Sequence, residues 1–326
     1  MSIVTQKTRK KDLGIYYTPQ EVTDFIFSVL TTLKDKEDKE TGRWQSRKPK
    51  PHWPSVIDPA VGEGVFLKTA IESGFTQPQY VFGVDIDEDV VEQWEQINLL
   101  RSFGSQAELE HHFFHQNGLL PLNGKMVLRY KKGGLKEFDV AVGNPPYGGV
   151  GLGETELTDE LLSHLTKFEI LPEKVRNHLL QADRQNSLFD WHKAIHVNPG
   201  AKKRIKSFPI EVLFIDRFIQ LVKSGGWIAL IIPDGILANS NLHYVRQFVA
   251  EKTKVLGIVS LPRDTFKQVG TSAKTSILFL QKFREDDNKD LKYPVFLASI
   301  NKLEKKYFEK LTDSFKEFQF YGKLKS

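Results

Sequence analysis

The segment Asn144-Pro145-Pro146-Tyr147 joins a polar amide, two rigid residues and an aromatic ring directly after the apolar run at 138–143. Each proline fixes its own φ, and Pro146 also keeps Pro145 extended, so the direction of the Pro145 carbonyl is set. The Asn144 side-chain oxygen and this carbonyl could then accept both hydrogens of one amino group. Tyr147 offers a face on which a flat ring can stack. The turn predicts a clamp for an aromatic amine; a plain Pro-Pro turn capped by asparagine is the alternative.

A second polar segment, DPAVGEG at 58–64, follows an apolar run and precedes a helical pattern. Its glycines allow a tight turn and the close approach of a ligand. Asp85 comes 27 residues after Asp58, at the end of another apolar run, where a carboxylate can accept hydrogen bonds from two ribose hydroxyls. Ile86 could cover one face of an adenine ring. The pattern favours a nucleotide-type ligand, although the missing Gly-x-Gly-x-x-Gly disfavours NAD.

Six short apolar runs indicate the strands that would position these side chains. They span 56–59, 80–86, 138–144, 227–233, 254–262 and 275–281, and alternate with helical patterns at 63–73, 89–100, 209–222 and 241–252. This alternation predicts an α/β fold with a mostly parallel sheet, and near-continuous apolar runs suit strands covered on both faces. The last run closely follows its predecessor, so we expect an antiparallel final strand. Because ligands bind beyond the carboxyl ends of parallel strands, we expect Asp58, Asp85 and Asn144 to share one rim.

The composition excludes several classes of protein. The 326 residues contain no cysteine, which rules out a disulfide framework, a thiolate metal site and a cysteine nucleophile. No apolar stretch approaches the roughly 20 residues of a membrane span, and residues 1–12 lack the apolar core of a secretory signal. We therefore expect a cytoplasmic protein that does not associate with a membrane.

Charge and histidine positions give weaker signals. The net charge is +5, with basic blocks at 7–11, 43–50 and 202–206. This favours a polyanionic partner only weakly, because a solvated surface is the simpler explanation. The three histidines between residues 111 and 115 have no carboxylate at ligand spacing. We interpret them as strand and rim histidines and expect no metal site.

In chain order, these segments resemble a known family. DPAVGEGVFL at 58–67, GVDID at 83–87 and NPPY at 144–147 are similar to motifs of the gamma-class adenine-N6 DNA methyltransferases of restriction–modification systems. YYTPQEV at 16–22 is similar to the extra motif that this class carries before its first strand. The segments at 225–237 and 260–280 resemble later motifs, especially those of type I modification subunits and type IIG enzymes.

The resemblance covers roughly residues 14–283, apart from an insertion at 151–207. It implies a Rossmann-like S-adenosylmethionine-dependent methyltransferase sheet with helices on both faces and an antiparallel final strand. The cofactor-binding residues that it implies are Thr18, Asp58, Ala60, Gly62, Gly64, Asp85, Ile86, Asn117 and Asn144. The catalytic residues that it implies are Asn144, Pro145, Pro146, Tyr147 and Phe266, with Phe266 facing the target base opposite Tyr147.

The chain departs from the family pattern at two places. Asn117 stands where the family usually has an acid that binds the adenine amine of the cofactor. Its carbonyl can still accept that hydrogen bond, though without a charge, so cofactor affinity is expected to be weaker. Val61 and Glu63 replace the small or hydroxyl residues common in the glycine turn. We interpret these two as variation, because Glu63 would not repel a cationic sulfonium.

The implied reaction transfers a methyl group from S-adenosylmethionine to the N6 amine of an adenine flipped out of duplex DNA. The lone pair of this amine is delocalised into the ring. Accepting both amine hydrogens at Asn144 and Pro145 favours the pyramidal form that can attack, and no dedicated base is required. Protein-glutamine methyltransferases and some RNA methyltransferases share NPPY, and a non-catalytic DNA-binding subunit could keep the same fold. These functions remain alternatives.

The expected organisation has five parts. They are an N-terminal helical segment with a cofactor motif (1–53), the cofactor-binding half with NPPY (54–150), an insertion and possible DNA contact (151–207), the second half of the sheet (208–283) and a charged C-terminal tail (284–326). We interpret residues 302–326 as a solvated helix and end segment. In this family target recognition belongs to a separate domain or subunit, and 284–326 is too short for an independent core. The expected partners are double-stranded DNA and a specificity subunit or additional recognition domain.

Overall fold

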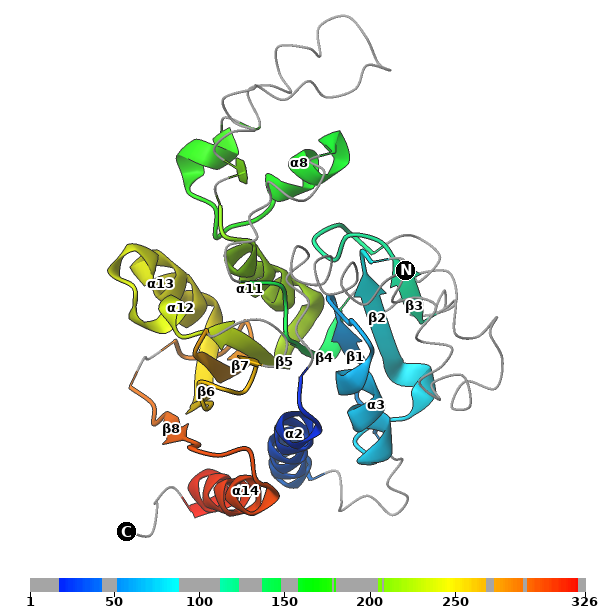
Figure 1. Ribbon diagram of the computed structural model, residues 1–326, viewed down its shortest axis with the longest axis vertical. Coiled ribbons are helices and arrows are strands. Elements are labelled where there is room, and N and C mark those ends of the chain that lie inside the picture. Colours follow the sequence, from blue (N-terminus) through cyan, green and yellow to red (C-terminus); the bar gives the residue numbers. More distant parts are fainter. Residues whose placement is uncertain are drawn as a thin grey trace, which may run out of the picture.

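In the part of the chain that the structure describes, eight strands form a mixed sheet, in the order β3-β2-β1-β4-β5-β7-β6-β8 (Figure 1). They are β1 (Val56–Asp58), β2 (Val81–Asp85), β3 (Phe113–His115), β4 (Phe138–Gly143), β5 (Val222–Pro233), β6 (Thr253–Ser260), β7 (Thr275–Lys282) and β8 (Phe296–Ser299). The strands from β3 to β5 are parallel, β7 is antiparallel to β5 and β6, and β8 is parallel to β6. The predicted mostly parallel sheet with an antiparallel β7 is confirmed. β3 and β8 lie outside the six apolar runs.

The structure is a computed structural model that describes ten segments of the chain. They are residues 18–42, 52–87, 112–122, 137–147, 158–177, 179, 205–206, 208–267, 273–289 and 292–321. Several predicted features lie outside them: the helical pattern at 89–100, the basic blocks at 7–11 and 43–50, most of the block at 202–206, Tyr16, Tyr17, His111, and large parts of the insertion.

Helices cover both faces of the sheet (Figure 1). They are α2 (Gln20–Glu40), α3 (Val65–Glu72), α8 (Asp159–Leu165), α11 (Ile210–Leu221), α12 (Gly235–Ala238), α13 (His243–Lys252) and α14 (Lys305–Tyr321), with 3-10 turns at Pro78–Tyr80 and Ser240–Leu242. One core cluster joins α2, α3 and α14 to the sheet, and a second joins α8, α11 and α13 to its other face. Along β5, Ile228 and Leu230 belong to the second cluster while Ala229 and Ile231 belong to the first. Burial on both sides explains why this strand is apolar at consecutive positions.

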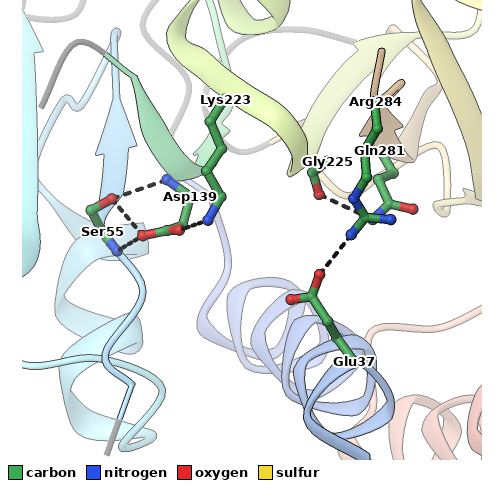
Figure 2. A network of polar contacts seen from close by, with 7 residues as sticks. All are labelled: Glu37, Ser55, Asp139, Lys223, Gly225, Gln281 and Arg284. Carbon is green, nitrogen blue, oxygen red and sulfur yellow. Dashed lines mark hydrogen bonds and ion pairs between the residues drawn. The ribbon is translucent and has the colours of Figure 1, made fainter. Parts of the chain in front are cut away.

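A polar network joins the amino ends of the central strands (Figure 2). Asp139 Oδ2 accepts hydrogen bonds from the backbone N and from Oγ of Ser55, both at 2.8 Å, and Asp139 forms an ion pair with Lys223. Burial opposes ionisation of Asp139, but the contacts with Lys223 and Ser55 outweigh it and hold the pKa of this carboxyl below its usual value. The network lies at the end of the sheet opposite the predicted site, because these residues come at the starts of their strands.

The C-terminal part of α2 lies near the same end of the sheet. Arg284, which follows β7, donates from Nη2 to Glu37 Oε1 of α2 at 2.8 Å (Figure 2). Gln281 Nε2 donates to the Gly225 carbonyl at 3.0 Å. Gly225 has a φ of 79°, and a Cβ at this position would lie 2.7 Å from Arg284 Nε. The arginine therefore reaches α2 past an irregular part of β5, at a position where a side chain would be both strained and crowded.

Helix α14 extends the core, which corrects the interpretation of its residues as part of a solvated helix and end segment. Phe308 and Phe315 of α14 are 4% and 1% exposed, and α14 packs beside α2 (Figure 1). Ser28 Oγ of α2 and Thr312 Oγ1 of α14 share a hydrogen bond of 2.8 Å. The apolar residues Phe308, Leu311, Phe315 and Phe318 recur at helical spacing among lysines and glutamates. The many charged residues between these positions led to the prediction of a solvated helix.

Candidate functional site

The glycine turn lies between β1 and α3, at the carboxyl end of β1. Gly62 and Gly64 have left-handed φ angles of 49° and 80°, which other residues adopt only with strain. Gly64 is also the N-cap of α3, so the helix begins directly at the turn. Val61 N donates to the Val84 carbonyl at 2.9 Å and holds the turn against the end of β2. The turn therefore presents its backbone at the rim where β1 and β2 end.

Asp58 ends β1 and is fully buried. Its Oδ1 accepts a hydrogen bond from Ala60 N at 3.0 Å, whereas Oδ2 has no hydrogen-bond donor among the residues that the structure describes. Burial raises the pKa of Asp58 well above its usual value; the Ala60 hydrogen bond lowers it in part, and the Asp85 carboxylate raises it further. A buried carboxyl oxygen of this kind favours a cationic or hydrogen-bond-donating ligand.

Asp85 ends β2 and links the two strand ends. Its Oδ2 accepts a hydrogen bond from Gly62 N at 2.7 Å, and its Oδ1 accepts one from Asp87 N at 2.9 Å. Burial raises the pKa of Asp85, against the lowering effect of these two hydrogen bonds. Each carboxylate oxygen can accept a second hydrogen bond, so ribose hydroxyls are compatible with this geometry. The adjacent Ile86 is 49% exposed and offers an apolar surface.

The loop after β3 packs against the glycine turn. A Cβ at Gly118 would lie 1.8 Å from the Pro59 carbonyl oxygen, so only glycine permits this approach. The preceding residue, Asn117, is thereby brought to the same rim. Asn117 Oδ1 accepts a hydrogen bond from Leu119 N at 2.9 Å. Because an amide oxygen has two lone pairs, this atom can accept a further hydrogen bond from a ligand.

Asn144 follows β4, the strand next to β1. Its Nδ2 donates to Oγ1 of the buried Thr18 at 3.2 Å, across 126 positions of the sequence. A Cβ at Gly143 would lie 2.6 Å from Asp58 Oδ1, so the ends of β1 and β4 are in close contact. The structure therefore brings Thr18, Asp58 and Asn144 together at one rim, together with Asp85.

The two aromatic residues singled out in the sequence contact each other. The rings of Tyr147, after β4, and Phe266, after β6, have centroids 6.5 Å apart and an interplanar angle of 79°. Both residues are fully buried, Pro145 is buried, and Pro146 is half-buried. Edge-to-face packing with full burial leaves no ring face open. Stacking of a base on either ring therefore requires the groups that cover that ring to move.

Two buried charged residues near the site were not identified from the sequence. Asp216 and Arg217 are 2% and 5% exposed in the middle of α11. Arg217 donates hydrogen bonds to the carbonyls of Gly118 and Leu120, in the loop that carries Asn117. A charged pair inside the mostly apolar sequence Ile210–Leu221 is the signal that could have identified them.

The two described histidines near β3 lie against backbone carbonyls. His112 Nδ1 lies 2.8 Å from the Val81 carbonyl, and His115 Nε2 lies 3.1 Å from the Ile86 carbonyl. Within the described segments, no group of three or more histidine, aspartate or glutamate side chains is arranged to hold a metal ion. None of the helices described has the length and apolar character needed to cross a membrane.

A family profile described as N-6 DNA methylase matches residues 3–179 and 186–323. The chain belongs to the N-6 DNA methylase family. This membership confirms the resemblance to adenine-N6 methyltransferases at the level of the family. The type II methyltransferase M.HincII of Haemophilus influenzae is 22% identical over 307 residues, which cover 93% of this chain and 45% of M.HincII. The chain thus spans less than half the length of the curated relatives that it matches.

Solved structures of similar proteins agree with the fold of this N-6 DNA methylase family member. The type I restriction–modification methyltransferase subunit of Streptococcus thermophilus is 18% identical with a TM-score of 0.57, over 93% of this chain and 53% of that chain. A Listeria monocytogenes protein, provisionally described as a class I S-adenosylmethionine-dependent methyltransferase, is 21% identical with a TM-score of 0.54, over 93% of this chain and 71% of that chain. The predicted S-adenosylmethionine-dependent methyltransferase fold is confirmed.

Proposed function

We propose that this chain is the catalytic part of a DNA adenine-N6 methyltransferase that uses S-adenosylmethionine. The observation that carries the proposal is the meeting of two kinds of site at one rim. The glycine turn with Asp58 and Asp85 suits a nucleoside cofactor, and the Asn144 turn suits an aromatic amine. A Cβ at Gly143 would lie only 2.6 Å from Asp58 Oδ1, so the two sites adjoin. Membership of the N-6 DNA methylase family supports the same reaction.

The residues at the glycine turn fit the groups of the cofactor. S-adenosylmethionine has an ammonium group, ribose hydroxyls and an adenine, and it supplies a methyl group on a positively charged sulfur. Asp58 Oδ2, buried and without a donor among the described residues, fits a cationic group. Asp85 fits the ribose hydroxyls, the exposed Ile86 fits the adenine face, and Asn117 fits the adenine amine. Ala60, Gly62 and Gly64 supply the backbone that the cofactor approaches.

Thr18 orients the amide that receives the target amine. The Thr18 hydroxyl oxygen accepts a hydrogen bond from Asn144 Nδ2 at 3.2 Å. With Nδ2 directed at Thr18, Oδ1 points to the other side of the amide, as an acceptor of an amine hydrogen must. Pro145, fixed by Pro146, provides the second acceptor from its carbonyl. Together the two oxygens hold the amine in the pyramidal form that attacks the methyl group.

Capture of the flipped-out base requires the Tyr147–Phe266 pair to open. An edge-to-face aromatic pair is worth about 0.5–1.5 kcal/mol beyond its buried area. Stacking of a base on an aromatic side chain is worth about 1–3 kcal/mol. Replacing the ring–ring contact by ring–base contacts is therefore favourable, and it offsets part of the few kcal/mol that unstacking the base from the duplex costs.

We also propose that the substrate is double-stranded DNA in a restriction–modification or related defence system. Recognition of the DNA target sequence then needs a specificity subunit or further recognition residues. Two observations support this proposal. Residues 296–321 complete the sheet and cover α2 instead of forming a separate unit. M.HincII is more than twice as long as the matched region. The DNA contact predicted for 151–207 and the cytoplasmic location remain predictions.

A methyl-transfer assay tests the proposed function. The purified chain is incubated with methyl-labelled S-adenosylmethionine and, separately, with genomic duplex DNA, total RNA and a protein extract. We expect label in N6-methyladenine of DNA after nucleoside digestion and mass spectrometry, and none with Asn144→Ala. Label in RNA or in protein glutamine would assign one of the alternative functions. Cofactor binding by calorimetry without transfer to any substrate, including DNA in cells expressing the chain, would indicate a non-catalytic subunit.

A further inference from the structure

Arg217 is a buried cation whose hydrogen bonds converge on one loop. Its Nε donates to the Gly118 carbonyl at 2.9 Å, and its Nη2 donates to the Leu120 carbonyl. Burial lowers the pKa of Arg217 to about 10, with Asp216 opposing the shift, so the guanidinium keeps its charge at neutral pH. Burying a charge is costly, and hydrogen bonds from a charged donor are stronger than neutral ones. The arginine therefore gives this loop a defined position.

The loop is held from three further directions. Gln116 N donates to the Asp85 carbonyl at 2.8 Å, which fixes the loop to the end of β2. At Gly118 a Cβ would lie 1.8 Å from the Pro59 carbonyl oxygen of the glycine turn and 3.4 Å from Phe214 Cε1 of α11. The loop is thus packed between α11 and the glycine turn. Asn117 lies between the points held by Gln116 and by Arg217.

Within the loop, Asn117 is fixed by its own hydrogen bonds. Its Oδ1 accepts from Leu119 N at 2.9 Å, and its backbone carbonyl accepts from Leu120 N at 3.0 Å. The Leu120 carbonyl is one of the two groups that Arg217 holds. Displacement of the arginine would therefore change the orientation of the Asn117 side chain.

We infer that Arg217 is a positioning residue for the cofactor: by holding the carbonyls of Gly118 and Leu120, it places Asn117 at the rim beside Asp85. The inference rests on the proposed function, in which Asn117 accepts a hydrogen bond from the cofactor adenine. Arg217 acts through the loop and is not a catalytic residue. The competing interpretation is a structural role, in which the arginine contributes to stability and has no specific effect on Asn117.

The neighbouring Asp216 provides a matched control. It is equally buried on the same helix, but its hydrogen bonds go elsewhere: Oδ2 accepts from Ile170 N at 3.0 Å, and Oδ1 accepts from Gln220 Nε2 at 3.0 Å. It therefore holds the segment after α8 and not the loop after β3. Asp216→Asn removes a buried charge beside Arg217 but leaves both hydrogen bonds from Arg217 to the Asn117 loop in place.

Amide hydrogen exchange of the cofactor-free chain tests the inference directly. In Arg217→Met the amides of Leu119 and Leu120, which bond to Asn117, should exchange at least about tenfold faster than in the wild type. In Asp216→Asn these two amides should exchange at the wild-type rate. Unchanged exchange at Leu119 and Leu120 in Arg217→Met would overturn the inference, whatever the chain binds.

A double-mutant cycle tests the consequence for cofactor binding. Calorimetry at a temperature where all variants are folded should show that Asn117→Ala and Arg217→Met each raise the Kd for S-adenosylmethionine by about five- to tenfold, the effect of one neutral hydrogen bond. The double variant should be no weaker than the weaker single variant, because both remove the same contact. Additive effects would overturn the inference in favour of a structural role.

The outcomes separate this inference from the proposed function. If the wild-type chain does not bind S-adenosylmethionine, the proposed function fails, while the exchange experiment still decides whether Arg217 orders the loop. If Arg217→Met does not fold, Gly118→Ala displaces the loop from the side of Pro59 with the arginine intact. A folded Gly118→Ala variant should lose cofactor affinity without additivity to Asn117→Ala. Wild-type affinity in that variant would contradict the inference.

Discussion

Asp58→Asn tests whether the Asp58 carboxyl binds a ligand or serves the fold. The substitution keeps the size of the side chain and an oxygen to accept the Ala60 N hydrogen bond, which is 3.0 Å long in the structure. It replaces Oδ2, which has no donor among the described residues, by an amide nitrogen and removes the charge. A cationic group of the cofactor therefore loses its counter-charge, while the fold loses no hydrogen bond that the structure describes.

The loss of affinity can be estimated from the contact that Asp58 Oδ2 would make. A hydrogen bond to a charged group is worth about 1.5–3 kcal/mol. Since about 1.4 kcal/mol corresponds to a factor of ten, the Kd for S-adenosylmethionine should rise roughly tenfold to a hundredfold at pH 8. Isothermal titration calorimetry measures this change. A Kd within about twofold of the wild type would remove Asp58 from the cofactor site.

The pH dependence of the free energy of unfolding gives an independent test of the burial of Asp58. Because burial raises the pKa of Asp58 in the folded chain, its carboxyl is most favourable when protonated at acidic pH. That contribution is lost as pH rises from the unfolded value of about 3.9 through the raised folded pKa. Asp58→Asn cannot ionise, so its free energy of unfolding relative to the wild type should improve as pH rises through this range. Denaturant unfolding at several pH values measures this difference; a pH-independent difference would refute the argument.

Asp139→Asn is the matched control at the other end of the sheet. Asp139 is held by Lys223 and Ser55, and its pKa is lowered (Figure 2). Its contribution to stability is therefore present above the unfolded pKa and lost as pH falls through the folded pKa. Asp139→Asn should destabilise the chain most at neutral pH, the opposite sign to Asp58→Asn, and should leave the Kd for S-adenosylmethionine unchanged.

The remaining predictions concern the target base and DNA. Asn144→Ala should leave cofactor affinity within about threefold but lower single-turnover methyl transfer by about a hundredfold or more, because the lost acceptor acts mainly in the transition state; near-normal transfer would contradict the clamp. Phe266→Ala should weaken the fluorescence change of a base analogue at the target position, and Phe266→Trp should retain it; equal signals from all three proteins would exclude a stacking role. The chain alone should bind duplex DNA weakly, with steep salt dependence and little sequence preference. Titration of random and candidate-site duplexes at two salt concentrations checks this, and tight site-selective binding would show that this chain reads bases itself.

Much of the fold could be predicted because its signals are local. Apolar runs such as 227–233 and 138–144 are buried on both faces over most of their length, so nearly consecutive apolar residues carry the signal. The rim could be predicted because the carboxyl ends of parallel strands lie at one edge of a sheet. Asp58 and Asp85 end β1 and β2, and Asn144 follows β4. Strand β8 and the packing of α14 were not predicted, because most residues in and around these segments are charged or polar.

By itself the sequence determined which residue types stand at the strand ends, and hence the chemistry that this rim can offer. Tertiary structure alone decided which further groups contact this rim and how buried its side chains are. The hydrogen bonds of Arg217 to the loop after β3 and of Thr18 to Asn144 join residues roughly a hundred or more positions apart. The full burial of Asp58 and the closed contact between Tyr147 and Phe266 likewise depend on neighbours from other elements. Burial, pKa and ring geometry are set by those neighbours, and no local pattern encodes them.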